Sequence, residues 1–531
     1  PCSRVIRSPE NLTINKTPAE DNRVVDIGHE IGEDNIEVLG LDIHNPVFMI
    51  SALSVVALVT GTLLFPELAT EWFLSMKSWV TSKFDWFFMV SVNFFIIFCI
   101  AIAVSPFGKI RLGGPGATPA YKYSGWLAML FAAGVGIGLM FFGVYEPMTH
   151  TLNSAPLGVN PLDLEASRAV GMSATIFHWG LHAWAIYAVV GLALAFFCFN
   201  RKMPLTLRSA FFPLFGKAVW GPFGHLIDVM AVLATIFGLS TSLGFGAEQI
   251  AAGLNFLFGV AEGNLTKIVL IVVIMSMALI SVVAGLDKGV KVLSELNMSM
   301  AAILGLFVLV AGPTAYILEQ FWHTTVDYLV YLPSLSGWIG REDTDFFHGW
   351  TIFYWAWWIS WSPFVGMFIA RISFGRTIRE FITWVLLMPT VISIVWMSTL
   401  GGAGFEQYFD QGITSLAEVP PELSLYVMLE SLPFSGFVST VSVLLIAIFF
   451  VTSADSGSLV IDTMTAGGKM NAPVQQRVFW CISTGLVAIA LLVGGGMASL
   501  QALTIAVGLP FCLVLLVMCA SLYKGLAEEP R

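Results

Sequence analysis

Charged side chains are scarce in this chain of 531 residues: 11% of its residues are Asp, Glu, Lys or Arg, while 57% are hydrophobic. Soluble domains usually carry about 25% charged residues, so a water-soluble fold is excluded. Hydrophobic runs of about 20 residues, enough to cross a bilayer as a helix, recur along almost the whole chain. Runs such as 268–283 and 441–451 lack the alternating polar positions of a membrane β-barrel. The sequence therefore predicts an all-α integral membrane protein.

Several chemical signatures are also missing. The six cysteines form no CxxC pair, so neither a zinc site nor a disulfide framework is supported. The net charge is −10 and no basic patch stands out, so we expect no nucleic-acid partner. HExxH and GxSxG do not occur, so we expect a protein that is not an enzyme. The first hydrophobic run begins near Val47, behind a polar segment, which predicts a retained span rather than a cleaved signal peptide.

Twelve hydrophobic spans are predicted, and the positions of Lys and Arg support that number. The spans are 46–65, 86–105, 126–149, 171–198, 223–257, 266–286, 297–318, 347–370, 381–404, 434–463, 475–495 and 498–523. Basic residues concentrate in alternate loops, at 106–125, 199–222, 371–380 and 464–474. By the positive-inside rule these loops are cytoplasmic, and twelve spans place both termini on that same side.

The spans divide the chain into regions. We expect a cytoplasmic N-terminal tail (1–45), two peripheral transmembrane helices with their loops (46–125), a first repeat of spans 3–7 (126–318), an extracellular amphipathic connector (319–346), a second repeat of spans 8–12 (347–523) and a short cytoplasmic C-terminal tail (524–531). Because each repeat has five spans, the second enters the membrane inverted.

Polar or helix-breaking residues interrupt matching spans of the two repeats. Span 3 carries a glycine-rich segment at 134–138 and span 8 carries Pro363, so we expect both helices to be interrupted. Hydroxyl side chains cluster at 238–242 in span 5 and at 452–456 in span 10. Broken helices and hydroxyls within lipid indicate a transport site near the middle of the membrane.

Tryptophans are concentrated in span 8, where four lie between 355 and 361. Helical spacing puts Trp357, Trp358 and Trp361 on adjoining faces. Span 4 adds a second aromatic set, which consists of Trp179, Trp184 and Tyr187. Aromatic faces attract cations and suit quaternary ammonium groups, which cannot donate hydrogen bonds. The alternative is an aromatic belt at the membrane interface.

Glycines in span 3 offer a partner for an anion. If Gly134, Gly136 and Gly138 unwind the helix, the freed backbone N–H groups can bind a carboxylate and the freed carbonyls a cation. The alternative is close helix packing through small residues. Together with the aromatic faces, the glycines indicate a zwitterionic onium solute, one that carries an ammonium or sulfonium group and a carboxylate.

The hydroxyls of Thr452 and Ser453 are candidate sodium ligands, although such side chains also bond to the backbone one turn earlier. Asp455 and Glu248 are the acids that the sequence places deepest in the membrane, so they would carry a proton-coupled alternative. We expect His178 to be packed or hydrogen-bonded, and the same for His182, which follows it by four residues.

Three segments (131–147, 353–371 and 449–457) strongly resemble the betaine/choline/carnitine transporter family, and their motifs are most similar to those of sodium-coupled glycine betaine symporters. The resemblance covers all twelve spans. It implies the five-plus-five inverted repeat of the LeuT-like fold, a homotrimer, and a multi-pass protein of the bacterial inner (plasma) membrane.

The resemblance also implies roles for individual residues. An aromatic box would consist of Trp179, Trp184, Tyr187 and Trp358, with Trp357 and Trp361 on the pathway or in neighbouring states. One sodium site would use the carbonyls of Ala132, Val135 and Phe449 with the hydroxyls of Thr452 and Ser453. A second site would use Thr235 near Phe364, but Leu239 stands where another hydroxyl would be wanted.

The predicted function is a symporter that imports glycine betaine, or a close analogue such as dimethylsulfoniopropionate, with sodium. Spans 3, 5, 8 and 10 carry no Lys or Arg in their interiors, unlike the sodium-independent exchangers that the family includes. Choline carriers of the family tend to have an aspartate where Gly138 stands. The alternative is a proton-coupled or sodium-independent carrier of carnitine, choline or ectoine; a channel would need continuous polar stripes.

Overall fold

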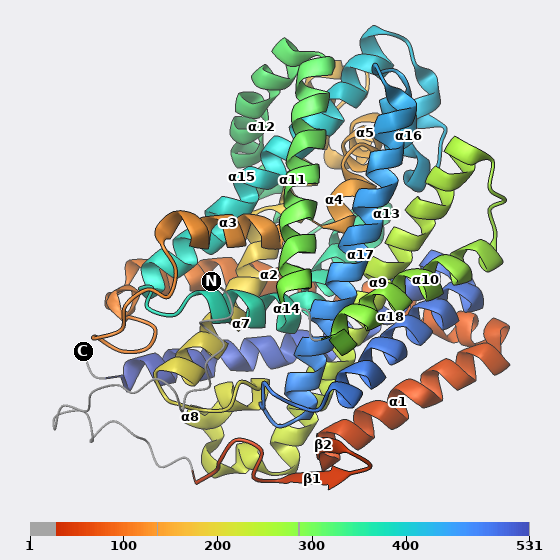
Figure 1. The fold of residues 1–531 in the computed structure, drawn as a ribbon. Helices are drawn as coiled ribbons and strands as arrows, with labels where there is room; N and C mark the ends of the chain where they lie inside the picture. Colours follow the sequence, from red (N-terminus) through yellow and green to blue (C-terminus); the bar gives the residue numbers. More distant parts are fainter. Residues whose placement is uncertain (1–27, 135, 285–286, 530–531) are drawn as a thin grey trace.

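Long helices make up most of the protein. The computed structural model describes residues 28–134, 136–284 and 287–529. A short β-hairpin and the helix α8 (Phe212–Phe215) lie at one end of the helices, at the bottom of Figure 1, and the helices α12 (Thr314–Leu335) and α16 (Pro421–Glu430) lie at the opposite end. Loops that the sequence assigns to opposite sides of the membrane therefore lie at opposite ends of the molecule.

The first half of the chain contains α1 (Asn45–Leu64), α2 (Pro66–Val104), α3 (Tyr123–Gly134), α4 (Ile137–Phe142), α5 (Tyr145–Leu152), α6 (Leu164–Trp179), α7 (Leu181–Phe199), α9 (Pro222–Phe258), α10 (Asn264–Ala284) and α11 (Asp287–Ala311). The second half contains α13 (Thr344–Phe346), the π-helix η7 (Phe347–Ile352), α14 (Phe353–Ile372), α15 (Ile378–Phe405), the π-helix η8 (Glu406–Asp410), α17 (Ser435–Thr465) and α18 (Val474–Ala527). Short 3-10 turns are η3 (Pro106–Lys109), η4 (Ala155–Leu157), η5 (Leu207–Phe211), η6 (Gly216–Trp220) and η9 (Thr414–Ala417).

Several helices begin at residues that satisfy or remove the unpaired N–H groups of a first turn. α2 and α9 start with Pro66 and Pro222. Proline has no backbone N–H, and at the first position of a helix that N–H would have no intrahelical acceptor in any case. α15 begins with a capping box, in which Thr377 accepts from the backbone of Glu380 and the Glu380 carboxylate accepts from the backbone of Thr377. These local signals fix where the helices start.

Among the described residues, nine helices are long and apolar enough to cross a membrane. The difference from twelve has physical causes. Span 3 is broken into short helices, and the tryptophan-rich helix α14 of span 8 is not one of the nine. Spans 11 and 12 merge in α18, whose 54 residues would measure about 80 Å at 1.5 Å per residue. Gly495 and Gly496 have non-helical dihedral angles inside α18, where the chain can turn between two crossings. Twelve crossings therefore stay a prediction.

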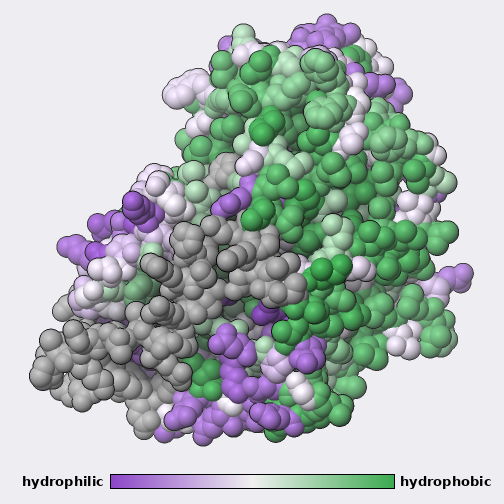
Figure 2. Space-filling model, viewed as in Figure 1, coloured by the Kyte–Doolittle hydropathy of each residue, from purple (hydrophilic) through white to green (hydrophobic). Residues whose placement is uncertain are grey.

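Apolar side chains face outward between the two ends. Leu53 is 62% exposed, Ile280 66% and Val310 67%. Figure 2 shows hydrophobic residues over much of the visible face and hydrophilic residues along its lower edge. A soluble protein rarely exposes apolar patches of this extent, so this surface fits contact with lipid in a multi-pass membrane protein.

The N-terminal region is more structured than the sequence indicates. Strands β1 (Asn35–Val38) and β2 (Leu41–His44) form an antiparallel hairpin inside the predicted tail, so the all-α prediction is wrong here. Leu39 and Gly40 both have positive φ, the requirement of a tight type I′ turn. Asn35 Nδ2 donates to the carbonyl of Ala466, and the hairpin is thereby tied to the end of α17.

Pro363 does not interrupt span 8, contrary to the sequence prediction, because α14 continues through it. A proline leaves the carbonyl four residues earlier without its helical donor. Here the Ser362 hydroxyl donates to the carbonyl of Ile359 at 2.7 Å and replaces that bond. The irregular part of span 8 is its beginning, the π-helix η7.

Candidate functional site

The glycine-rich segment of span 3 breaks the helix, as predicted. α3 ends at Gly134 and α4 begins at Ile137, with Gly136 in an extended conformation between them. Val135, one of the predicted sodium ligands, lies outside the described residues. The break leaves backbone groups of both helix ends without intrahelical partners, which is the situation that ion and carboxylate binding requires.

A second break lies in span 4, which the sequence predicts as one helix. α6 ends at Trp179 and α7 begins at Leu181, with Gly180 outside the helical region between them. A Cβ atom on Gly180 would lie 2.7 Å from the carbonyl oxygen of Ile176, so the turn needs a glycine. The break places the Trp179 ring at a helix end, beside the tryptophans of α14.

Four of the predicted aromatic residues gather in one buried group. Trp179 meets Trp358 edge to face with ring centroids 5.0 Å apart, and Trp357 stacks on Trp358 at 4.6 Å. Tyr187 lies 6.2 Å from Trp358 at 71°. Trp184 contacts Tyr187 at 5.2 Å and so lies at the edge of the group. From here on, the aromatic box means the group that the structure forms, Trp179, Tyr187, Tyr354, Trp357 and Trp358, in place of the expected set of Trp179, Trp184, Tyr187 and Trp358.

Tyr354 belongs to the box although the sequence analysis did not select it. Its ring lies 5.5 Å from Trp179 and 5.6 Å from Trp358. The available signal was its place four residues before Trp358, on the same face of a helix. Trp361 is different: it lies beyond the box, half-buried, and contacts Phe364 at 5.0 Å.

Gly138 lies directly against the box. A Cβ atom at this position would lie 3.2 Å from Trp357 Cη2 and closer still to Trp179. No described atom lies within 4 Å of a Cβ atom on Gly136. Of the three predicted glycines, Gly138 therefore shapes the wall of the box, while Gly136 and Gly134 shape the helix break.

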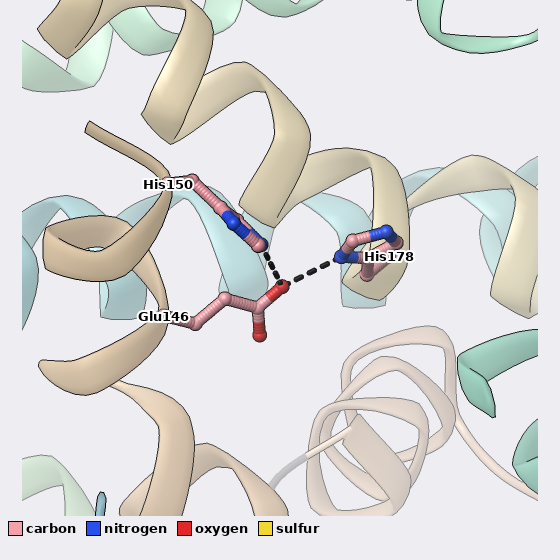
Figure 3. A group of neighbouring side chains, drawn as sticks. All are labelled: Glu146, His150 and His178. Atoms are coloured by element: carbon pink, nitrogen blue, oxygen red, sulfur yellow. Dashed lines mark hydrogen bonds and ion pairs between the residues drawn. The ribbon is translucent and has the colours of Figure 1, made fainter. Parts of the chain in front are cut away.

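A carboxylate that the sequence analysis missed lies behind the box. Glu146 of α5 is fully buried, and its Oε2 accepts from Trp179 Nε1 at 2.8 Å and from the Tyr354 hydroxyl at 2.5 Å. Its Oε1 accepts from His178 Nδ1 at 2.6 Å and from His150 Nε2 at 3.3 Å (Figure 3). The sequence analysis favoured Asp455 and Glu248 because it gave no weight to a carboxylate beyond the glycine break.

Glu146, His150 and His178 are residue types that bind metal ions, and their ligand atoms lie within 4.8 Å of one another. Two ligands of a tetrahedral zinc ion, however, are about 3.3 Å apart for metal–ligand distances near 2.0 Å. The 2.6 Å between His178 Nδ1 and Glu146 Oε1 is the length of a hydrogen bond between a donor and a carboxylate. We therefore interpret this group as a hydrogen-bonded cluster.

His178 and His182 are packed and hydrogen-bonded, as expected. His178 Nε2 lies 3.0 Å from the hydroxyl of Thr351, and His182 Nε2 lies 3.0 Å from Asn93 Oδ1. Both rings are buried.

The predicted sodium ligands on α17 lie close to the broken helix. A Cβ atom on Gly246 of α9 would lie 3.2 Å from both Ile137 Cδ1 and Phe450 Cδ2, so α4, α9 and α17 meet beside Phe449. Ser453 is half-buried, and so is Ala132 near the end of α3. This arrangement is compatible with a shared ion, but the coordination itself stays a prediction.

Asn297 of α11 is a polar neighbour that the sequence analysis missed. Its Nδ2 donates to Thr452 Oγ1 at 3.1 Å, while the Thr452 hydroxyl is 3.0 Å from the carbonyl of Ile448. Asn297 Oδ1 is buried without a hydrogen-bond partner among the described residues. A lone amide at the start of the apolar run 297–318 was the available signal. A buried amide oxygen without a partner calls for an explanation, and amide oxygens belong to the oxygen ligands that hard cations accept.

At the predicted second sodium site, the described hydroxyls bond to a backbone carbonyl or to another hydroxyl. The Thr235 hydroxyl donates to the carbonyl of Ala231 at 2.7 Å, a backbone bond of the kind that the sequence analysis gave as the alternative for Thr452 and Ser453. Leu239 packs so closely on Gly457 that a Cβ atom there would lie 2.3 Å from it. In the hydroxyl cluster of α9, Thr241 Oγ1 lies 2.7 Å from Thr504 Oγ1 of α18. The Thr235 hydroxyl bonds within its own helix and the Thr241 hydroxyl connects α9 with α18, so the second site stays a prediction.

Glu248 has a cationic partner. Its carboxylate lies 2.6 Å from Lys267 Nζ, and the two side chains are 12% and 22% exposed. An ion pair that water reaches has its charge neutralised locally, so Glu248 does not stand alone as a proton carrier.

Comparison with known proteins supports the interpretation as a transporter. The model of the betaine/carnitine/choline transporter family matches residues 46–531. A glycine betaine/proline/choline transporter of Vibrio parahaemolyticus serotype O3:K6 is 52% identical over 97% of each chain. Glycine betaine transporter 1 of the same bacterium is 49% identical over 94% of this chain and 97% of its own. A glycine betaine transporter of Acinetobacter baylyi is 45% identical over 91% of this chain and 73% of its own.

These relatives are transporters rather than enzymes, and the match extends from the first helix to the end of the chain. Together with the apolar helices and the buried aromatic box, they establish that this multi-pass membrane protein belongs to the betaine/carnitine/choline transporter family.

Proposed function

We propose that this protein is a sodium-driven symporter that imports glycine betaine or a close onium analogue such as dimethylsulfoniopropionate. The observation that supports the proposal most is the aromatic box itself. The ring centroids of Trp179, Trp357 and Trp358 lie within 6.3 Å of one another, and the rings of Trp179 and Trp357 lie against Gly138. A compact cation without N–H donors binds to such faces through the ring quadrupoles, with about 2 kcal/mol or more per ring when desolvated.

The names of the relatives agree with this substrate class. Glycine betaine occurs in three of them, and proline and choline occur in one. Gly138 favours a zwitterion, because the adjacent helix break offers backbone N–H groups to a carboxylate. We therefore place glycine betaine first among the substrates.

Sodium coupling is supported by the neighbourhood of Thr452. The Thr452 hydroxyl, the Asn297 amide and the carbonyl of Phe449 lie together, since Thr452 Oγ1 is 3.1 Å from each partner. The hydroxyl of Thr452 and the carbonyl of Phe449 offer oxygen atoms of the kind that a hard cation prefers, and the Asn297 side chain adds an amide oxygen that is buried without a hydrogen-bond partner among the described residues. The ion that we propose there is sodium.

The family membership also supports the architecture. We propose twelve crossings, in two inverted repeats of five behind two peripheral helices, with both termini in the cytoplasm of a bacterium and the helices in its inner membrane. We further propose a homotrimer. Crosslinking of purified protein in lipid, followed by mass measurement of the intact species, tests the trimer.

Uptake by proteoliposomes tests the transport proposal. We expect saturable accumulation of labelled glycine betaine when an inward sodium gradient is imposed, and no accumulation when potassium replaces sodium. A competition panel of glycine betaine, dimethylsulfoniopropionate, carnitine and ectoine ranks the substrates. Accumulation driven by a proton gradient without sodium would contradict the proposal and favour the proton-coupled alternative, whose candidates are Asp455 and Glu248.

A further inference from the structure

The Glu146 carboxylate is connected to the aromatic box by two hydrogen bonds. Trp179 Nε1 and the Tyr354 hydroxyl both donate to Oε2, at 2.8 and 2.5 Å. Both donors belong to rings that form the box, and Glu146 itself is 0% exposed. Glu146 therefore lies at the N–H edge of the Trp179 ring and the O–H end of the Tyr354 ring, behind the two rings rather than over their faces.

The groups around Glu146 are hydrogen-bond donors, so both oxygens of its carboxylate must act as acceptors. An indole N–H can only donate, and the Tyr354 hydroxyl donates to the same oxygen. His178 Nε2 can accept from the Thr351 hydroxyl, which leaves the proton on Nδ1 for Glu146. An ionised Glu146 carboxylate can accept hydrogen bonds from all four groups. A protonated carboxyl group would place its own O–H donor against one of these donors.

Among the partners that the structure describes, none of the four that bind Glu146 has a permanent positive charge: they are a tryptophan, a tyrosine and two histidines. The negative charge is therefore delocalised over hydrogen bonds rather than cancelled by an Arg or Lys. In a buried setting with little water, such a charge acts over a longer distance than it would in solution.

The two hydrogen bonds to the box rings have a defined electronic effect. A donor bound to a carboxylate is polarised, so electron density moves from the N–H or O–H group into the ring that carries it. The π faces of Trp179 and Tyr354 become more negative. Because cation–π attraction depends on the charge of the ring face, their attraction for a cation rises.

We propose that Glu146 is a positioning residue that sets the preference of the box for a cationic head group over an uncharged head group of the same shape. It acts through Trp179 and Tyr354, whose rings it orients and polarises, and does not touch the substrate. This inference rests on the proposed function, because it assumes that an onium solute occupies the box.

A pair of ligands separates charge from shape. Glycine betaine and 3,3-dimethylbutanoate have the same outline and the same carboxylate, but a neutral carbon replaces the nitrogen cation in the second. The measured quantity is the ratio of their dissociation constants, determined by calorimetry on the full-length protein in detergent with sodium present. A variant that disturbs packing weakens the binding of both ligands, whereas a variant that reduces the polarisation of the Trp179 and Tyr354 rings weakens only the binding of glycine betaine.

The variants remove the carboxylate charge or one of its hydrogen bonds. We expect Glu146→Gln to reduce the preference for glycine betaine by about tenfold, the effect of losing charge-assisted bonds to two rings. Tyr354→Phe keeps the ring and removes one donor, so we expect a reduction of about threefold. The control is Tyr426→Phe, which removes a buried hydroxyl that donates to the carbonyl of Gln249 at 3.0 Å, outside the box. Its ratio should equal that of the wild type.

The outcomes are distinguishable. A ratio of dissociation constants that stays at the wild-type value in both Glu146→Gln and Tyr354→Phe overturns the inference, whether binding of the two ligands is unchanged or equally weakened. The proposed function is left intact by that result. If Glu146→Gln does not fold, the ratio in Tyr354→Phe decides. A wild-type protein that binds no glycine betaine contradicts the proposed function instead.

Discussion

Gly138 lies so close to Trp179 that a Cβ atom on the glycine would be 2.5 Å from Cη2 of the indole. Atoms of real side chains do not approach to that distance, so the position excludes every residue larger than glycine unless the indole moves. The indole is itself held by its bond to Glu146. The glycine-rich segment of span 3 therefore has two roles, the helix break and the space for an aromatic wall.

We expect Gly138→Asp to raise the apparent KM for glycine betaine at least about tenfold, since the side chain displaces Trp179 and its charge repels the substrate carboxylate. Choline has no carboxylate, so its uptake should increase relative to that of glycine betaine. The measurement is labelled uptake of both solutes. Gly61→Ala in α1, where no described atom lies within 4 Å of the added Cβ, is the control. An unchanged KM for glycine betaine would remove Gly138 from the site.

Replacement of Trp358 tests the box directly. Trp358→Leu should abolish measurable uptake while expression stays normal, because leucine fills space without a π face. Trp361→Leu should cause a smaller loss, since Trp361 contacts Phe364 outside the box. Uptake assays with quantified protein in the membrane compare the two. Near-native affinity in Trp358→Leu would show that the onium group binds elsewhere.

The sodium dependence of uptake tests the group around Thr452. We expect Thr452→Ala/Ser453→Ala to raise the sodium concentration for half-maximal uptake strongly, and to weaken glycine betaine binding as a coupled consequence. Asn297→Ala should shift the sodium curve in the same direction, because it removes the hydrogen bond from Nδ2 to Thr452 and the buried Oδ1, which has no partner among the described residues.

Thr235→Ala separates the two proposed ion sites. Leu239 stands one turn after Thr235, whereas a second hydroxyl, that of Ser453, follows Thr452, so we expect a much smaller shift of the sodium curve than for Thr452→Ala/Ser453→Ala. A sodium curve that moves with Thr235 and not with Thr452 would reverse the assignment of the sites.

The docking of the N-terminal hairpin should depend on pH. Burial and the charge of Arg208, whose Nη1 lies 3.1 Å from His44 Nε2, lower the pKa of His44 from 6.5 to about 3. Below pH 6.5 the His44 imidazole therefore binds a proton when the hairpin is detached, but stays neutral when the hairpin is docked. Docking is complete above pH 6.5 and weakens as the pH falls toward 3, by about 2 kcal/mol at pH 5. Hydrogen exchange of residues 35–44, corrected for its intrinsic rate, measures this effect.

His44→Gln is the matched variant for that experiment, since glutamine has no charge to gain. We expect its hairpin to show little pH dependence between 5 and 7.5. Equal pH dependence in both proteins would assign the effect to another group of this cluster.

The parts of the fold that depend on hydrophobic length were predictable. Runs of apolar residues predicted α1, α9, α10, α15 and α17 within a few residues, and loop charges placed α8 and α12 at opposite ends. The predicted spans 86–105 and 297–318 were wrong at their starts, since α2 begins at Pro66 and α11 at Asp287. Features that depend on single backbone bonds were not predictable. Gly180 breaks span 4, whereas Pro363 leaves span 8 intact because Ser362 replaces the lost bond. A residue type alone does not show whether a neighbour compensates for it.

The residues of the candidate site also divide into those that the sequence pattern indicates and those that only contacts between helices reveal. Trp357 and Trp358 were predictable from helical spacing, and Gly138 from the helix break. Glu146, Tyr354 and Asn297 were missed because their roles come from contacts between helices that are distant in sequence, such as α5 with α6 and α14. The hydroxyls of α9 show the converse, since a pattern typical of ion ligands serves contacts with α18.

The hairpin β1–β2 has a consequence for biosynthesis. Its partner on the end of α17, the carbonyl of Ala466, lies 431 residues after Asn35 in the chain. At about 5–20 residues per second, a ribosome needs roughly 20 to 90 s to cover that distance. The hairpin emerges early but cannot dock until nearly every helix has been synthesised, so its attachment marks a late stage of assembly and can serve as a signal that the helices have come together.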